Sequence, residues 1–514
     1  MQKIDPQSWK QNMPAFREKA EGFQSGAVTR NEYKGFSGRY GSYAQRDGTK
    51  NMLRLRMPGG RVTREKLRFV AESVRAHGVD TIHFTTCQAI QLHNLGTDAL
   101  CAIMEGALDV GIVTIGGGGD FPRNTMCSPL SGVEQGEYFD VLPYAEAAGE
   151  YAMRFVNAEK MPRKLKVGFS NGPANLPHVT YRDLGFAARA DGTFDVYSAG
   201  GLGNNPKFGV LVAEGVAPCD ILAYVKAMWL TFRTYGNYEN RGKARTRYMQ
   251  DVCGGPEGYK KAYLEKLAEV RASGEDFSFV AEPVTVSKQG DGSTASGKRV
   301  IPQKQDGLYA VKWHPIGGQP TPGQFCAVAD AVCAIDGAEM RIAPDETAYV
   351  INLTGDEAMK MLELTAGGAE TAFEASVSCI GATICQVGLR DSQGLLRACV
   401  AAVREAGIAD GALPVIHISG CPSSCGTHQT AAIGFRGAVR RSEAGPQSAF
   451  SMTVGGNDRQ GSETMGTEVG VLFEKDIPAF LVELGRAVMA SGTDYAGFVK
   501  ASPNAVAELA AKYL

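Results

Sequence analysis

Four cysteines in the last third of the sequence have a spacing suited to a metal centre. Cys379 and Cys385 form a C-x5-C pair, and Cys421 and Cys425 form a C-x3-C pair after 35 intervening residues. Thiolates from two short loops can hold an iron–sulfur cluster, and the Gly, Pro and Ser around the second pair suit a tight loop whose amides point at sulfur. Structural zinc sites favour closer spacing, from C-x2-C to C-x4-C. The spacing favours a cluster over zinc, with unligated core cysteines as a third alternative.

The other cysteines call for a different interpretation. Twelve cysteines in 514 residues do not suggest a disulfide framework, because such frameworks belong to small secreted domains. Five of them lie in apolar, helix-like runs, where a free cysteine behaves as a small hydrophobic residue. We expect these five in the core: Cys101, Cys219, Cys326, Cys333 and Cys399.

Positive charge is concentrated at Arg163, Lys164 and Lys166. On a strand the two lysines face one side and Leu165 faces the other. By the same alternation, Arg54 and Arg56 share one strand face. Two cations on one face can hold an anion, although from the residues alone a solvated charge run is the simpler interpretation.

Two segments that carry these residues follow one pattern. Residues 52–111 read as a strand, a Gly-rich turn, the helix TREKLRFVAESVRAHG, the strand DTIHFTTCQAIQLHNL and a second helix. Residues 308–368 repeat that order at nearly the same lengths, with the strand AEMRIAPDETAYVINL. The sequence therefore predicts a duplicated unit whose two copies form a pseudo-symmetric pair.

The repeat and the composition between them predict the domains. Residues 287–307 are rich in Gly, Ser and Lys without apolar periodicity, which indicates an exposed linker between the halves. Strands and helices mix without strict alternation, which favours an α+β fold. We expect an N-terminal extension (1–50), half-domain 1 (51–114), a first longer block (115–286), the linker, half-domain 2 (308–368) and a second longer block (369–514).

The overall composition limits the class of protein. The formal net charge is -2, with 44% hydrophobic and 21% charged residues, so no charge bias points to nucleic acid. No apolar run approaches the ~18–20 residues of a membrane span, and the first residues lack the apolar core of a signal peptide. A cytoplasmic enzyme is the expectation.

Several motifs together resemble the siroheme-containing nitrite and sulfite reductase family. They are the two cysteine pairs with GCPSSCG before an AAIGF strand, the segment RLRMPGG, the Arg123-Asn124 pair in DFPRNTMC, the run PRKLK, the cluster AGGLG and the text TYGNYENRGKARTRY. They occur in order over roughly residues 50–440. The resemblance implies a duplicated nitrite/sulfite reductase fold, with two ferredoxin-like half-domains and two α+β domains that bind siroheme and cluster.

The resemblance also implies the cofactors and the site. The four cysteines would bind a 4Fe-4S cluster, and Cys425 would also be the axial ligand of the siroheme iron. Arg123, Lys164 and Lys166 match the positions that hold the anion on the open face. Siroheme has eight carboxylates, so its pocket should be basic; the candidates are Arg54, Arg56, His83, Gln91, Asn124, Arg245 and Arg247.

One position departs from the family. In FTTCQAIQLH, Cys87 stands where the family has an arginine of the substrate-binding set. A neutral thiol removes one positive charge from the pocket, and we expect either a thiol tolerated beside the cofactor or compensation by a nearby cation such as His83. Cys87 therefore joins the candidate catalytic residues.

The resemblance implies six-electron reduction of nitrite to ammonia or of sulfite to sulfide, and SSCG after Pro422 leans toward the nitrite branch. The sequence carries no flavin or nicotinamide motif, so electrons would come from ferredoxin or a flavoprotein. Two alternatives stay open: a tetrapyrrole enzyme similar to precorrin-3B synthase, and a cluster-bearing electron-transfer subunit without siroheme.

Overall fold

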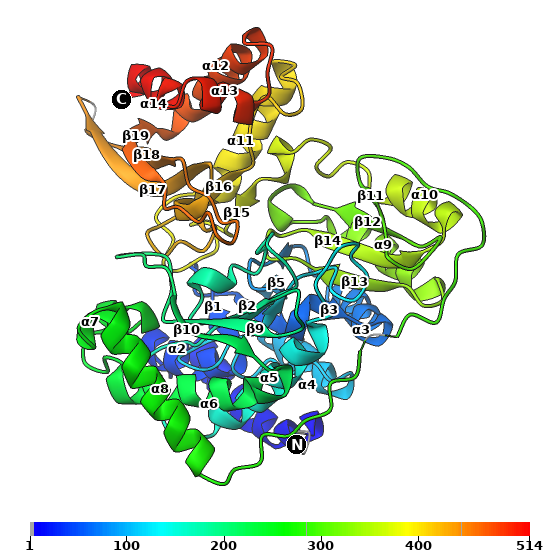
Figure 1. Cartoon of the computed structure of the whole chain (residues 1–514), viewed down its shortest axis with the longest axis vertical. Coiled ribbons are helices and arrows are strands. Elements are labelled where there is room, and N and C mark those ends of the chain that lie inside the picture. The colour runs from blue at the N-terminus through cyan, green and yellow to red at the C-terminus, as the bar shows by residue number, and fades with distance from the viewer. Residues whose placement is uncertain (1–4, 284, 444) are drawn as a thin grey trace.

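Figure 1 shows a computed structural model of the chain, which describes residues 5–283, 285–443 and 445–514. The named strands of these residues form four sheets, and each sheet built from the first half of the sequence has a counterpart built from the second half. The duplicated α+β architecture predicted from the repeat is confirmed.

The first half-domain is a four-stranded antiparallel sheet in the order β1-β2-β5-β4. Helix α3 connects β2 to β4 and α4 follows β5, and the Thr63 hydroxyl caps α3 by accepting from Lys66 N. That helix buries Leu67 and Val70 against the sheet. The elements are β1 (Ser42–Ala44), β2 (Asn51–Arg56), α3 (Arg64–Ala76), β4 (Ile82–Phe84), β5 (Ala89–Leu95) and α4 (Thr97–Asp109).

The second half-domain repeats this arrangement with one strand borrowed from the first. Its sheet has the order β11-β12-β14-β13-β3, and Val62 of the short strand β3 (Arg61–Val62) pairs with Met340. The elements are β11 (Val300–Pro302), β12 (Tyr309–Trp313), α9 (Pro322–Ala334), β13 (Glu339–Ile342), β14 (Ala348–Leu353) and α10 (Gly355–Leu364). The predicted linker, 287–307, is therefore not all coil, because Val300–Pro302 within it form β11 against β12.

Each repeat differs from the sequence prediction in one way that matters for the site. The single long strand expected at 80–95 is a hairpin of β4 and β5, and the one expected at 338–353 is a hairpin of β13 and β14. Gln88 and Glu346 have φ of 55° and 68° at the turns, a left-handed conformation that no strand continues through. The first hairpin places Cys87 at its turn.

The two longer blocks contain a second pair of equivalent sheets. In each, three strands are parallel and the next two are antiparallel, in the orders β6-β7-β8-β9-β10 and β15-β16-β17-β18-β19. The strands are β6 (Met126–Cys127), β7 (Val167–Ser170), β8 (Leu184–Ala188), β9 (Phe194–Ser198), β10 (Val210–Val216), β15 (Val377–Ser378), β16 (Ile416–Ser419), β17 (Ile433–Ser442), β18 (Gly445–Val454) and β19 (Thr467–Phe473).

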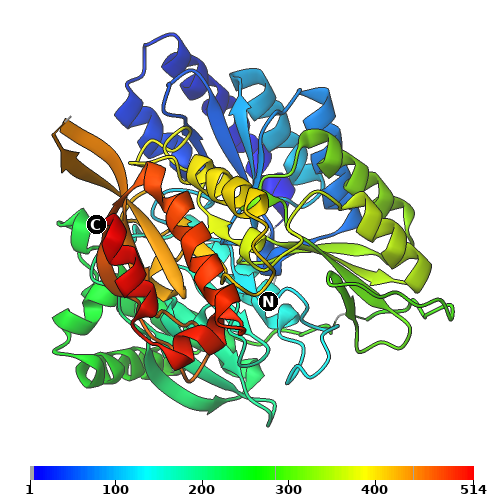
Figure 2. The same cartoon turned by 90° about the horizontal axis from the view of Figure 1, so that it is seen from above.

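Helices cover both of these sheets. The first block has α5 (Leu142–Met153), α6 (Ile221–Tyr235), α7 (Met249–Val252) and α8 (Pro256–Ala272), and the second has α11 (Ser392–Glu405), α12 (Ile477–Ala490), α13 (Tyr495–Ala501) and α14 (Ala505–Ala510). Figure 2, seen from above, shows α11 and the last three helices beside the β15–β19 sheet. Residues of α12 and α14 belong to that sheet's core, so the C-terminal segment covers the second half as predicted.

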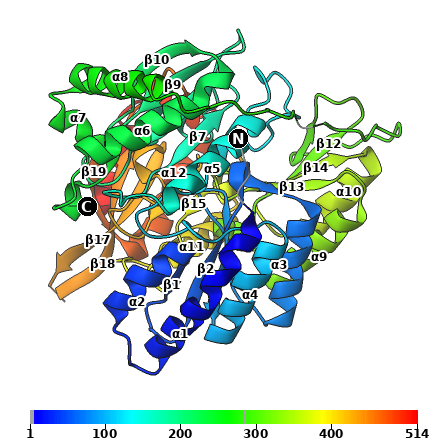
Figure 3. The same ribbon diagram turned by 90° about the horizontal axis from the view of Figure 1, so that it is seen from below.

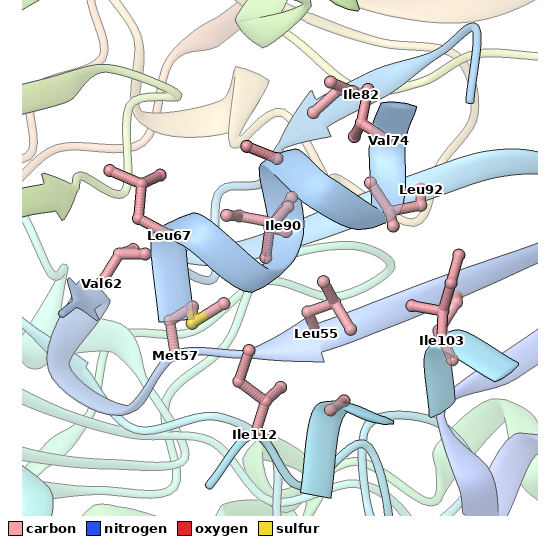
Figure 4. Packing of buried hydrophobic residues seen from close by; sticks show 14 of the residues in the cluster. Leu55, Met57, Val62, Leu67, Val74, Ile82, Ile90, Leu92, Ile103 and Ile112 are labelled. Atoms are coloured by element: carbon pink, nitrogen blue, oxygen red, sulfur yellow. The ribbon is translucent and has the colours of Figure 1, made fainter. Parts of the chain in front are cut away.

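A single hydrophobic core joins the two half-domains. It contains Leu67 and Val74 of α3 together with Phe325 and Val328 of α9, and these two helices lie side by side in Figures 1 and 3. Figure 4 shows Leu55, Met57 and Ile90 packed beneath α3. The pseudo-two-fold pair therefore has a shared interior.

The N-terminal segment also joins this core. Trp9, Met13 and Phe16 are buried in it, the last two on α1 (Met13–Gln24), which precedes α2 (Arg30–Ser37). Although this segment is polar overall, these buried side chains hold it against α4. No helix among the described residues is both long and apolar enough to cross a membrane.

One expectation for the non-motif cysteines is wrong. Cys101, Cys326 and Cys399 are buried and Cys333 is half-buried, but Cys219 is exposed. Cys219 lies in a short 3-10 turn, Pro218–Asp220, just before α6. The apolar run that suggested burial begins only with α6, and the turn before it faces solvent.

Candidate active site

The four motif cysteines lie at one edge of the β15–β19 sheet. Cys379 directly follows β15, and Cys421 comes two residues after β16, which pairs with β15 in parallel. Parallel strands bring their carboxyl ends to the same edge. Gly420 N donates to Cys379 Sγ over 3.2 Å, an amide–sulfur bond of the kind the Gly-rich loop predicts.

Glycine is required where this loop returns to the sheet. Gly426 N donates to Ser419 Oγ over 3.1 Å, and a Cβ at Gly426 would collide with the Ile418 carbonyl oxygen. This close approach fixes the position of the neighbouring Cys425, whose carbonyl oxygen accepts from Thr86 Oγ1 over 2.9 Å. The loop is thereby joined to the hairpin turn that carries Cys87.

The thiols are close enough to influence one another. Burial, followed by the charge of Cys425, raises the pKa of Cys379 to about 12, and burial also raises the pKa of Cys385. Among the described residues, no three Cys, His, Asp or Glu side chains converge as ligands of one metal ion.

The predicted anion-binding cations lie together at the amino edge of the first equivalent sheet, because Arg123 precedes β6 and both lysines precede the parallel strand β7. Lys166 immediately precedes β7, Leu165 is buried, and the two lysines are half-buried, as the alternation predicts. Burial lowers the pKa of Lys164 well below its usual value, and after burial the largest contributions are from Lys166, Arg245 and Arg123. Cys425 has the opposite effect on this pKa, so the cations and the cysteine loop face a common space.

Arg123 is held in this space by backbone oxygens. Its Nη2 donates to Gly119 O over 2.8 Å, its Nη1 donates to Gly117 O, and its buried Nε has no partner among the described residues. Burial and the nearby Arg54 lower the pKa of Arg123 to about 10. A partly desolvated guanidinium with a free N–H is suited to bind an anion as a hydrogen-bond donor.

Cys87 lies at the same place. Its carbonyl oxygen accepts from Asn124 Nδ2 over 2.9 Å. Burial raises the pKa of its thiol, but Lys166 and Arg182 outweigh burial and the net pKa falls to about 6. The thiol therefore faces the cations, while the predicted compensating residue, His83, has its Nε2 3.4 Å from Glu346 Oε1 in the other half-domain.

The candidate cofactor residues of half-domain 1 form a row across its sheet. The strand register aligns Arg54 with Gln91 and Gln91 with His83. With its oxygen turned toward Arg54, the Gln91 amide accepts from Nε over 3.0 Å. Arg56 is buried, and its Nη1 donates to Ile115 O over 2.8 Å and to Met153 Sδ over 2.7 Å, so these bonds stay within the protein.

The Asn124 side chain also donates its hydrogen bonds to backbone oxygens. Its Nδ2 donates to Met57 O over 2.8 Å and to the Cys87 and Gln88 carbonyls, while its buried Oδ1 has no partner among the described residues. The amide therefore holds the hairpin turn against the loop that carries Arg123.

The remaining two candidates come from the segment before α7. Arg245 Nη2 donates to Asp183 over 3.0 Å, and Arg247 Nε donates to Asn205 O over 2.9 Å. Arg245 Nε and Arg247 Nη1 are buried without partners among the described residues. Each arginine thus has one nitrogen held by a hydrogen bond within the protein and another nitrogen free to donate to a ligand.

Two residues of this site were missed at the sequence level. Arg182 is buried and acts on the Cys87 thiol, and Asp183 binds Arg245 and accepts from Lys166 N over 2.8 Å. The text TYRDLGF carries one cation and one anion, a pair that usually cancels at the surface. Alignment of this segment with AAIGF in the second repeat would have singled it out.

Comparison with known proteins agrees with this geometry. The family model for the "Nitrite and sulphite reductase 4Fe-4S domain" matches residues 118–269, and that for the "Nitrite/Sulfite reductase ferredoxin-like half domain" matches residues 43–110. The chain belongs to the nitrite and sulfite reductase family. The segments matched are the first half-domain and the block that carries Arg123, Lys164 and Lys166.

Relatives within the family cover most of the chain. The chloroplastic ferredoxin–nitrite reductase of Arabidopsis thaliana is 26% identical over 83% of this chain and 73% of its own length. The sulfite reductase [NADPH] hemoprotein beta-component 1 of Pectobacterium carotovorum is 25% identical over 85% and 81%. The structure of Mycobacterium tuberculosis NirA shares the fold, with a TM-score of 0.75, 21% identity and coverage of 93% and 90%.

Proposed function

We propose that this nitrite/sulfite reductase family member reduces a small oxyanion, nitrite or sulfite, by six electrons at a siroheme coupled through the Cys425 thiolate to a 4Fe-4S cluster. The observation that carries the proposal is the contact between the cysteine loop and the anion-binding residues. Thr86 Oγ1, next to Cys87, donates to Cys425 O over 2.9 Å, and Asn124 Nδ2, next to Arg123, donates to Cys87 O over 2.9 Å.

The residues present suit a cofactor with many carboxylates. Arg245 Nε and Arg247 Nη1 are buried N–H donors without protein partners among the described residues, and such donors cost about 1–3 kcal/mol each unless a ligand satisfies them. Together with Arg54 they would hold the carboxylates of siroheme. Cys379, Cys385, Cys421 and Cys425 would hold the cluster, and the two groups supply the electrons for reduction when bound.

The protein's own contribution is charge and protons. At about 4 Å and an effective dielectric near 20, one cation stabilises an anion by roughly 4 kcal/mol before desolvation. The lowered pKa of Lys164 makes its ammonium a better acid, so its Nζ can donate a proton to an oxygen of the anion. Arg123, with its free Nε, binds and orients the anion.

Electrons would arrive from a separate protein. Relatives are named as ferredoxin-dependent nitrite reductases, so a ferredoxin is the proposed donor and a flavoprotein the second choice. The name of the Arabidopsis relative favours nitrite, whereas that of the Pectobacterium relative favours sulfite. Nitrite remains our first choice on the SSCG motif.

The test uses protein made in a siroheme-producing host. Its absorption spectrum should show siroheme bands, and it should oxidise reduced methyl viologen with nitrite or sulfite. Lys164→Gln should lower kcat/KM by about 10²-fold, the usual size of a lost general acid. Arg163→Gln is the matched control from the same run, because Arg163 Nη1 is paired with Asp120 over 2.8 Å.

Three results would contradict the proposal in different ways. A protein without extractable siroheme would favour the electron-transfer alternative. Bound siroheme without turnover of either anion would favour the tetrapyrrole enzyme, an alternative consistent with the replacement at Cys87. If Lys164→Gln were as active as the control Arg163→Gln, Lys164 would have no part in the mechanism.

A further inference from the structure

Arg182 is a buried cation that the mechanism above does not use. It lies two residues before β8 and only 7% of its surface is exposed. Its Nε donates to Pro177 O over 2.8 Å, and its Nη2 is 3.3 Å from His178 Nδ1. His178 is itself held by Asp458 over 3.2 Å, so the guanidinium is fixed in place at its loop side.

Arg182 lies beside Lys166 at the amino ends of neighbouring strands, because Leu184 N donates to Lys166 O over 3.2 Å. An added Cβ at Gly168, two residues after Lys166, would lie 3.7 Å from Arg182 Cγ. Lys166 and Arg182 are the two largest charges acting on the Cys87 thiol, ahead of Lys164. Arg182 Nη1 has no hydrogen bond to any described residue. A guanidinium that is anchored through Nε and Nη2, with Nη1 free of partners among the described residues, resembles Arg123, which also keeps one unpaired nitrogen.

The duplication supplies an independent argument. Val167 pairs with Leu184 in the first repeat as Ile416 pairs with Ile433 in the second, so equivalent residues differ by 249 in number. The left-handed residues obey the same offset: Asn175 and Ser424 have φ of 53° and 52°. No residue is inserted between these points, so equivalence extends across the whole segment.

Residues at equivalent positions of the two repeats differ in charge. Lys164, Lys166 and Arg182 correspond to Leu413, Val415 and Ala431, respectively. At these three positions, positive charge therefore occurs only in the first repeat, and the second repeat, which carries the cysteine loop, has apolar residues. The second repeat forms the same sheet without a cation at the position of Arg182, so the fold itself does not require this charge.

We propose that Arg182 is the fourth cation of the anion pocket and replaces the charge that Cys87 does not supply. The inference rests on the proposed function, since it assigns a further residue to the same site. Arg182 adds its charge to those of Lys164, Lys166 and Arg123, all of which lie within electrostatic range of the Cys87 thiol.

The test compares Arg182→Gln, the double variant Cys87→Arg/Arg182→Gln and a control, Arg189→Gln. Arg189 lies just after β8 and binds Asp195 at the surface over 2.9 Å. In the holoenzyme, spectral titration with nitrite should give a Kd raised about tenfold in Arg182→Gln, the effect of losing one charged hydrogen bond. Siroheme content should equal that of the wild type, and Arg189→Gln should bind normally.

The double variant distinguishes a lost charge from a damaged loop. It returns a guanidinium to the pocket from position 87, so nitrite affinity should recover to within a few-fold of the wild type. A second readout needs no cofactor: the pH profile of iodoacetamide alkylation at Cys87, followed by mass spectrometry of its peptide. Arg182→Gln should move this profile to higher pH, because one stabilising charge of the thiolate is gone.

Two outcomes would overturn the inference alone. One is wild-type nitrite affinity and an unmoved alkylation profile in an Arg182→Gln enzyme that still reduces the anion. The other is a parallel loss of siroheme content, which would make Arg182 a cofactor ligand. A wild-type holoprotein that binds neither nitrite nor sulfite would overturn the proposed function as well.

Discussion

At the scale of single residues, Cys87 makes anion binding sensitive to pH. The groups that act on its thiol are Lys166, Arg182 and Lys164, and Arg123 is also within range. With a thiol pKa of about 6, the residue is neutral below that pH and a thiolate above it. The thiolate repels an incoming anion, so binding must be accompanied by uptake of one proton at Cys87 Sγ.

We therefore expect nitrite affinity to fall as pH rises above about 6. The Kd should increase by up to about tenfold per pH unit, the limit for one linked proton, and Cys87→Ser should flatten the dependence. Spectral titration of the oxidised holoenzyme at a series of pH values measures both. An identical slope in the serine variant would assign the titration to another group.

At the scale of elements, the cysteine loop depends on its return to the sheet. Gly426→Ala would place a methyl group against the Ile418 carbonyl and force the loop to move, which typically costs about 1–3 kcal/mol. Because Cys425 is the preceding residue, we expect a several-fold loss of bound iron per chain, measured by elemental analysis.

Gly323→Ala is the matched control for this loop. Gly323 lies in α9, and an added Cβ there meets no atom within 4 Å. Helix propensity favours alanine by about 1 kcal/mol, so iron content should stay at the wild-type level. Full iron content in Gly426→Ala would mean that the loop tolerates the shift and that glycine is not needed for the cluster.

The elements also show what the sequence can and cannot predict. Alternation and helical periodicity predicted α3, α4, α9 and α10 and the shared face of Lys164 and Lys166, because these patterns are local. The hairpin turns at Gln88 and Glu346 were missed, since both residues take a left-handed conformation inside text that alternates like one strand. Arg182 was missed because its role depends on Cys87, a residue 95 positions away in the sequence.

At the scale of the whole molecule, the pairing of the halves could not be predicted from local patterns. Val62 pairs with Met340 across the two repeats, and His83 meets Glu346. Both contacts join residues more than 250 positions apart in the sequence. The repeat predicted that two copies exist and form a pair, but only the structure shows that β3 of the first joins the sheet of the second and that the two share one core.

This shared core predicts that the two half-domains unfold together. Phe84 of the first half lies with its ring centroid 5.7 Å from Trp313 and 6.2 Å from Phe325 of the second, and all three side chains are fully buried. Phe325→Ala should lower the free energy of unfolding by about 3–5 kcal/mol, the usual cost of truncating a buried phenylalanine.

Urea unfolding followed by tryptophan fluorescence tests this, because Trp9 and Trp313 lie in the shared core, one from each half of the sequence. The variant should shift the transition reported by this core to lower urea as one step, whereas Met359→Ala, at a half-exposed position on α10, should leave it in place. Two separated steps in the variant would mean that each half-domain keeps a core of its own. A single step would show that cavity formation at one helix destabilises both copies, as continuous packing from α3 to α9 requires.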